Sequence, residues 1–126
     1  MEQREIDKLG IDDERIVELF VNLGMPKTLA KTLVYISESI ECLSVEIERG
    51  ADLRQPEVSI AVQELNKRGW INKRDVKKEG KGRPTHIYKP TTSLLDVLNA
   101  LKIEKMKEFE DVNSDLEELE KILKSK

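Results

Sequence analysis

Apolar residues recur with helical spacing in the first third of the chain. Acidic residues precede the first set, and Gly24 follows it, as suits the start and the end of a helix. Its apolar positions are Ile16, Leu19, Phe20 and Leu23. Pro26 suits a helix start, and the second set is Leu29, Leu33, Ile36 and Ile40. The pattern predicts one helix ending near Gly24 and another running from Pro26 to about Ser39 or beyond.

Two further helical patterns follow, joined by a tight turn. In CLSVEIERG, Ser44 is a candidate cap and Gly50 a candidate stop, and Cys42 continues an apolar helical pattern. In RQPEVSIAVQELNKRG, Pro56 suits a first turn and Gly69 a termination. The inward stripe of this longer pattern is Val58, Val62 and Leu65. A short helix, a tight turn and a longer helix have the spacing of a helix-turn-helix.

The next segment alternates between extended and turn signals. WINKRDV and HIYKP are typical of short strands, and KKEGKGRPT lies between them. We therefore expect a hairpin with a long basic tip. Trp70 is expected to anchor the core at the start of the first strand, and Tyr35 of the second helix is expected in the core as well.

The last 35 residues contain neither glycine nor proline. With Thr92 and Ser93 as candidate caps, they predict one helix of about 30 residues. An early stripe is followed, after a stutter near Lys105, by the three-four spacing of a coiled coil. The early stripe is Leu94, Leu98 and Leu101, and the later one is Phe109, Val112, Leu116, Leu119 and Leu123. Such a seam must be buried on its own domain or on another subunit, and we expect a homodimer.

Composition fits a globular, charge-rich helical protein: 38% of the 126 residues are hydrophobic, 37% charged and 4% aromatic. The single cysteine excludes an internal disulfide and a cysteine-rich zinc site, and Cys42 is expected to be a buried, inert thiol. No apolar run approaches the roughly 20 residues of a membrane span, and the polar start is unlike a signal peptide. We expect a cytoplasmic protein.

The charge distribution is more informative than the net charge of -3. Residues 1–42 hold 5 basic and 9 acidic side chains, residues 43–90 hold 11 and 7, and residues 91–126 hold 6 and 9. Within residues 66–89 there are 9 basic and 2 acidic side chains. Positive potential therefore concentrates on one stretch, which favours a polyanionic partner there.

LRQPEVSIAVQELNKRGWI and GKGRPTHIYKP together resemble the reading helix and wing of winged-helix transcriptional regulators of the broad MarR/ArsR/TrmB-like superfamily, especially the small archaeal members. The resemblance covers residues 26–90. It implies a mainly α fold with a small β-hairpin: a winged helix-turn-helix DNA-binding domain over residues 1–91 and a coiled-coil-like dimerisation helix over residues 92–126. The expected function is sequence-specific binding of double-stranded DNA by a homodimer, most simply as a repressor.

The reading helix would occupy about residues 55–68 and lie in the major groove, where glutamine pairs with adenine and arginine with guanine. Its candidate DNA contacts are Arg54, Gln55, Glu57, Ser59, Ile60, Gln63, Lys67 and Arg68. The wing, residues 77–86, would follow the backbone or enter the minor groove. Its candidates are Lys77, Lys78, Lys81, Arg83, Thr85 and His86. The candidate dimerisation residues are Leu98, Leu101, Phe109, Val112, Leu116, Leu119 and Leu123.

Two residues depart from the family pattern. Arg54 falls where the family usually caps the helix with Ser or Thr, so either the register is shifted by one or Asp52 supplies the cap. Glu57 is awkward beside phosphates, although an acid suits the first turn of a helix. His86 alternates with Tyr88, and it either packs near the core or contacts a phosphate.

Catalytic chemistry finds little support. One histidine and one cysteine build no convincing nucleophile and base, GKG lacks the flanking pattern of a P-loop, and no metal or cofactor is expected. Two alternatives stay open. The winged helix could contact proteins in a transcription or other macromolecular assembly, with the acidic last helix docking on the partner. A small-molecule effector could also bind in a cleft between the second helix and the dimer helix.

Overall fold

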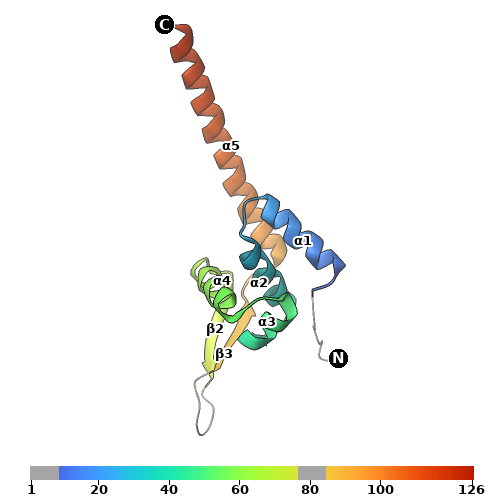
Figure 1. Cartoon of the computed structure of the whole chain (residues 1–126). Coiled ribbons are helices and arrows are strands. Elements are labelled where there is room, and N and C mark those ends of the chain that lie inside the picture. The colour runs from blue at the N-terminus through green and yellow to red at the C-terminus, as the bar shows by residue number, and fades with distance from the viewer. Residues whose placement is uncertain (1–8, 77–84) are drawn as a thin grey trace. The chain divides into compact units, whose positions relative to one another are not determined.

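The computed structural model describes residues 9–76 and 85–126 (Figure 1). The chain divides into two compact units, one ending at Ser93 and one running from Leu94 to Lys126. The helices of the first unit are α1 (Ile11–Asn22), α2 (Lys27–Ser37), α3 (Ser44–Ala51) and α4 (Gln55–Lys67). Its strands are β1 (Cys42–Leu43), β2 (Ile71–Val76) and β3 (Thr85–Pro90). The second unit is α5 (Leu94–Lys124).

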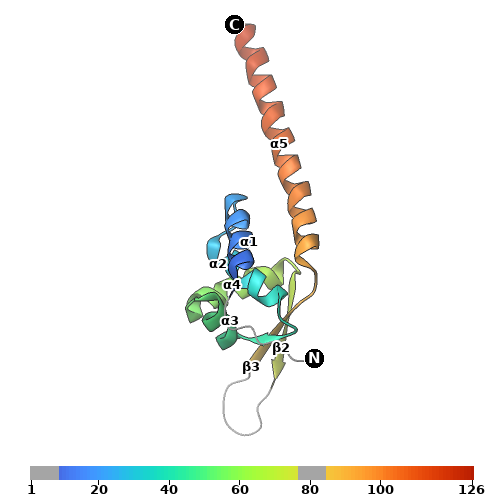
Figure 2. The same cartoon turned by 90° about the vertical axis from the view of Figure 1, so that its right-hand side faces the viewer.

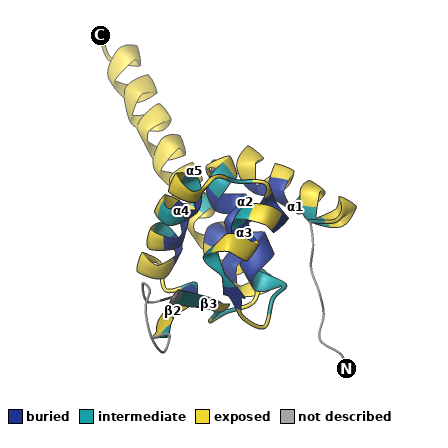
Figure 3. Ribbon diagram, turned by 60° about the horizontal axis from the view of Figure 1, so that its bottom comes forward, coloured by how far each residue is buried: buried dark blue, intermediate teal, exposed yellow. Residues whose placement is uncertain are grey.

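Helix α2 is the centre of the first unit and packs against α1, α3 and α4. Seven of its eleven residues are buried, including Tyr35 as expected (Figure 3). Its buried threonine is satisfied locally, because the Thr32 hydroxyl donates to the Thr28 carbonyl at 2.8 Å. A helix buried on several sides reads as nearly continuous apolar sequence, and the residues from Leu33 to Ile36 are all apolar and buried.

The second predicted helix is shorter than its sequence pattern suggests. It ends at Ser37, and the hydroxyls of Ser37 and Ser39 donate to the carbonyls of Val34 and Tyr35. Such local bonds satisfy the carbonyls left open at a helix end and compete with further helix. Ile40, which the spacing placed on the inward stripe, lies beyond the helix and is 80% exposed.

Helix α3 begins and ends differently from the expectation. Ser44 is its first helical residue, not its cap: Leu43 holds that place, and its backbone N–H donates to Glu46 Oε1 at 2.8 Å. Gly50 does not end the helix but is buried inside it, where a Cβ atom would overlap the Tyr35 ring. The helix ends after Ala51 because Asp52 adopts a left-handed conformation, with φ of 57°.

The expected hairpin is part of a three-stranded antiparallel sheet with the order β1-β3-β2 (Figure 2). Strand β1 was missed, because two residues are too few to show a period, and Cys42 therefore lies in a strand and not in a helix. Cys42 pairs with Tyr88, and Tyr88 also pairs with Lys73. Side chains of paired residues share a face of the sheet, and Cys42, Tyr88 and Ile71 are the buried members of one face.

Trp70 is not the core anchor that the sequence suggested. It is half-buried, and the guanidinium carbon of Arg68 lies 5.1 Å from its ring centroid. The next residue, Ile71, takes the buried position at the start of β2. Gly69, as expected, ends α4 with a positive φ of 81°.

Helix α5 has 31 residues, which confirms the expected single long helix. It begins at Leu94, directly after the two candidate caps. From Phe109 onward its apolar residues are exposed in the single chain. No helix within the described residues is long and apolar enough to cross a membrane.

Candidate nucleic-acid interface

The start of α4 resolves the two departures from the family pattern. Arg54 is the N-terminal cap residue, and its backbone N–H donates to Glu57 Oε1 at 2.9 Å. Glu57 therefore satisfies a backbone donor of the helix start, which is one half of a capping box. The predicted register is correct, and Asp52 ends α3 and does not cap α4.

Helix α4 has one buried and one exposed face. Val58, Ala61, Val62 and Leu65 are buried, and the helix packs against α2, α3 and β2. The exposed face holds polar residues and one large apolar residue, Ile60, which is 70% exposed. The fold thus displays most of the predicted reading residues together, while Glu57 and Ser59 are half-buried at the edge of that face. The exposed predicted residues are Arg54, Gln55, Ile60, Gln63, Lys67 and Arg68.

Arg68 already has partners within the chain. Its Nε donates to Glu64 Oε2 at 2.8 Å, and its guanidinium covers Trp70. The hydrogen bond from Arg68, together with its charge, lowers the pKa of Glu64. Lys67 is exposed and has no ion pair among the described residues. Of these two predicted phosphate contacts, Lys67 is therefore the less constrained.

The strands on either side of residues 77–84, β2 and β3, carry basic side chains that sequence reasoning left out of the site. Lys73, Arg74 and Lys89 are exposed. Arg74 lies on the opposite face of the sheet from Tyr88 and donates to Glu41 Oε1 at 3.2 Å. The consecutive charged residues of β2 were the signal that could have identified Lys73 and Arg74. Predicted contacts Lys77, Lys78, Lys81 and Arg83 lie outside the described residues, and Thr85 starts β3 opposite Val76.

His86 lies at the far end of the sheet face that carries Tyr88. Its Nδ1 is 2.6 Å from Asp75 Oδ1, and its ring centroid is 6.3 Å from that of Tyr88. The ring is half-buried and belongs to the wing strand, not to the core. Within the described residues, no group of three His, Cys, Asp or Glu side chains could hold a metal ion.

The predicted dimerisation residues fall into two groups in α5. Leu98 is half-buried and Leu101 is buried, whereas the five residues from Phe109 to Leu123 are between 53% and 71% exposed. Ile103, Met106 and Ile122 are also exposed, and the strict three-four spacing had passed over them. The exposed apolar surface of α5 therefore includes more residues than the predicted coiled-coil seam.

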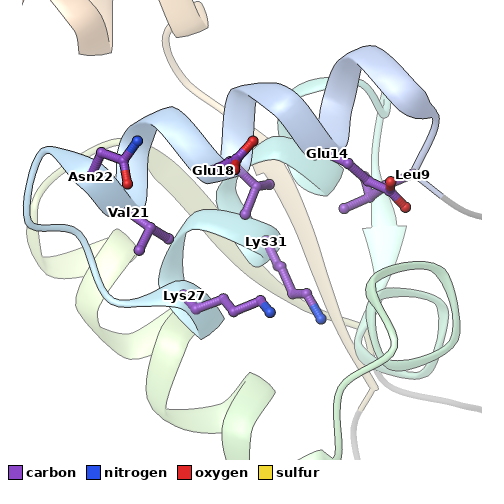
Figure 4. Close-up of a pocket in the computed structure, with 8 residues that line it drawn as sticks. Leu9, Glu14, Glu18, Val21, Asn22, Lys27 and Lys31 are labelled. Atoms are coloured by element: carbon purple, nitrogen blue, oxygen red, sulfur yellow. The ribbon is translucent and has the colours of Figure 1, made fainter.

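An open hollow of about 460 Å³ lies between α1 and α2 (Figure 4). Its walls mix aliphatic residues with two acidic residues of α1 and two lysines of α2. The lining residues are Leu9, Glu14, Val17, Glu18, Val21, Asn22, Lys27 and Lys31. Tyr35, which the sequence placed near a candidate effector cleft, is buried and not part of this lining.

No protein-family model matches the chain, and no curated protein matches it. Solved structures do. A possible transcriptional regulator from Methanosarcina mazei Go1 aligns with a TM-score of 0.63 and 15% identity, over 83% of this chain and 86% of that one. TrmBL2, described as an archaeal chromatin protein with a novel mode of DNA binding, aligns with a TM-score of 0.66 and 17% identity. The match covers 90% of this chain and 41% of TrmBL2.

The MarR family transcription regulator SP03579 aligns with a TM-score of 0.51 and 15% identity, over 78% of this chain and 63% of that one. This chain has the winged helix-turn-helix fold. At such low identities the likeness shows the fold alone, and it confirms the fold that the sequence resemblance implied. In winged-helix terms, α3 and α4 form the helix-turn-helix, and β2 and β3 flank the wing.

Proposed function

We propose that this protein is a sequence-specific, double-stranded DNA-binding transcriptional regulator that acts as a homodimer. The observation that carries the proposal is the exposed polar face of α4, whose opposite face is buried against the rest of the first unit. The names of the structurally similar proteins, which include transcriptional regulators and a chromatin protein, support the same function class.

In this proposal α4 enters the major groove. Its 13 residues span about 20 Å, and a helix of that size fits the groove. Gln55 and Gln63 can each pair with adenine through two hydrogen bonds, and Ile60 can contact the methyl group of thymine. Arg54 can donate hydrogen bonds to guanine or to a phosphate. Ser59, at the edge of the exposed face of α4, can reach the edge of a base.

Phosphate contacts would come from Lys67 and from the wing. Lys73 and Lys89 add exposed positive charge to the strands that flank residues 77–84, which contribute three lysines and an arginine. Because these charges lie within the most basic stretch of an acidic chain, they would orient the protein on DNA through this surface.

The exposed apolar residues of α5 support the dimer. Five of them repeat with coiled-coil spacing, and they are exposed in the single chain. A second subunit would supply the surface that buries them. A two-fold dimer would present two α4 helices to successive major grooves, with half-sites about 34 Å apart.

Binding to genomic promoter fragments over a salt series tests the proposal. Each phosphate contact should add about 0.9 to the slope of log affinity against log salt. Gln63→Ala should relax the sequence preference, whereas Arg83→Ala should weaken binding to all sequences alike. The proposal fails if double-stranded DNA is bound no better than by a neutral protein of this size.

A second candidate function is supported by the acidic character of α5. Residues 108–120 contain seven acidic side chains and no basic one, beside the exposed apolar stripe. This combination would suit docking on a basic protein surface in a macromolecular assembly. Sizing of the untagged protein separates the two: a stable dimer with DNA affinity supports the regulator, and a monomer without DNA affinity supports the docking module.

A further inference from the structure

Asp75 and His86 form a side-chain pair between the two strands that flank the basic segment 77–84. The two residues face each other across β2 and β3, and His86 Nδ1 lies 2.6 Å from Asp75 Oδ1. Their side chains are 61% and 41% exposed, so the pair lies at the surface. One further pair, Val76 with Thr85, separates it from the basic residues 77–84.

The contact determines what His86 can offer to a ligand. A carboxylate only accepts hydrogen bonds, so Nδ1 carries the proton in this contact. The remaining ring nitrogen, Nε2, has no partner among the described residues. In the neutral ring Nε2 is an acceptor, and in the charged ring it is a donor. Phosphate oxygens of DNA accept, so only the protonated ring can bond one through Nε2.

We propose that Asp75 and His86 form a proton-dependent phosphate contact, in which Asp75 orients the ring and the protonated Nε2 donates to the DNA backbone. The inference rests on the proposed function and adds a regulatory property to the wing. It also explains an acid in this position. Residues 66–89 carry 9 basic and 2 acidic side chains, and a bare carboxylate here would repel DNA.

Within the part of the chain that the structure describes, few ionisable side chains share the face of the sheet that carries the ring. Lys73 on β2 and Tyr88 on β3 share its face of the sheet, and Cys42 on β1 lies opposite Tyr88. Burial raises the pKa of Tyr88, and the Asp75 carboxylate raises it further, which agrees with their placement on one face. Helices α2 and α3 also pack against β3. The ionisable residues of these two helices are Lys27, Lys31, Tyr35, Glu46, Glu48 and Arg49, and Glu38 directly follows α2.

A single histidine makes the experiment direct. His86 is the only histidine in the chain, and histidine is the side chain that ordinarily changes charge between about pH 5 and 8. The affinity of the full chain for a selected duplex is measured at constant salt across this range. Because binding favours the protonated ring, we expect affinity to rise about tenfold as pH falls from about 7.5 to 5.5.

His86→Gln should abolish this rise, whereas Lys89→Gln, a matched change on the opposite face of β3, should lower affinity equally at every pH. Asp75→Ala distinguishes the two effects of Asp75, which are the orientation of the His86 ring and the repulsion of DNA by the carboxylate charge. It should raise affinity near pH 7.5 by removing a negative charge, and it should shrink the gain on acidification because the ring is no longer held. Circular dichroism at each pH confirms that every variant is folded.

The inference is overturned if the wild-type protein binds DNA with a flat pH profile, or if His86→Gln keeps the wild-type profile. Absence of DNA binding at every pH would instead overturn the proposed function. Asp75→Ala with an unchanged profile would show that the ring acts without its carboxylate partner and would remove Asp75 from the contact.

Discussion

The two units of the chain differ in how far their apolar side chains are buried. In the first unit, α2 buries seven of eleven residues, and even its buried threonine finds a backbone partner. In α5 the five residues of the later stripe, from Phe109 to Leu123, are between 53% and 71% exposed, although they repeat with regular three-four spacing. Regular spacing identifies an apolar face in both units, but only one of these faces is covered by the chain itself.

This difference suits two separate roles in the proposed regulator: the first unit would contact DNA, and α5 would hold the dimer together. A unit that satisfies its own core can hold α4 rigidly for DNA, because its geometry does not depend on a partner. A helix with an exposed stripe gains stability only by association, which links DNA affinity to protein concentration. We expect the two units to differ in solution as they do in the structure.

The largest expected difference is in thiol reactivity. Burial raises the pKa of Cys42 to about 12, so the thiol stays protonated at neutral pH. A Ser114→Cys variant keeps the native Cys42 and adds a second, exposed thiol on α5. Because alkylation of Cys42 requires opening of the unit, we expect it to react at least about a thousandfold more slowly than Cys at 114. Mass spectrometry after timed alkylation measures both, and equal rates would contradict the difference in packing.

The next effect concerns association. Leu116→Glu places a charge in the apolar stripe of α5 and should weaken the dimer by about a hundredfold or more, because burying an unpaired charge is costly. Ser114→Glu, on the opposite side of the helix, is the matched control and should leave the dimer intact. Analytical ultracentrifugation over a concentration series measures both. An unchanged mass for Leu116→Glu would show that this stripe is not the dimer contact.

Within the first unit, Gly50→Ala should be strongly destabilising. The added methyl group would overlap the Tyr35 ring, so α3 and α2 must separate, at a cost of about 1–3 kcal/mol. Gly10→Ala is the control, since its nearest atom would be the flexible Asp13 carboxylate at 3.7 Å. Urea unfolding gives the free energies. If both variants keep the wild-type free energy of unfolding, the close packing of α2 against α3 does not contribute to the stability of the first unit.

The smallest effect tests the start of α4. Glu57→Ala removes the bond to the Arg54 backbone N–H and should lower the free energy of unfolding by about 0.5–1.5 kcal/mol. It also removes a negative charge near the proposed DNA surface, so DNA affinity at low salt should rise. Glu57→Gln, which can still accept the bond, should raise affinity with a smaller loss of stability. Lower DNA affinity for both variants would indicate that Glu57 contacts DNA directly.

Much of the fold could be predicted from local signals. The pattern in residues 55–68 predicted both the buried stripe of α4 and its exposed polar face, because one helix period determines both. The cap at Arg54 was harder, since the bond comes from Glu57 three residues later and not from the cap side chain. The pattern that predicted α5 also identified its stripe, but no local pattern tells whether a stripe is covered.

The remaining differences arise from contacts distant in sequence. Strand β1 exists only because Cys42 and Leu43 pair with β3, more than forty residues later. Gly50 looked like a helix stop, yet its role is set by the Tyr35 ring packed against it. The Asp75–His86 pair needed the register of the hairpin, which sequence alone left open.

Selection of bound duplexes from a random-sequence pool tests whether the protein recognises a specific DNA sequence as a dimer. We expect enrichment of a palindromic site whose half-sites have centres about 10 base pairs apart, as a two-fold dimer with two reading helices requires. Gln63→Ala should lose the preference at one symmetric pair of positions and keep the spacing. Absence of any enriched site would contradict sequence-specific DNA binding, and enrichment of an isolated half-site would contradict the two-fold dimer.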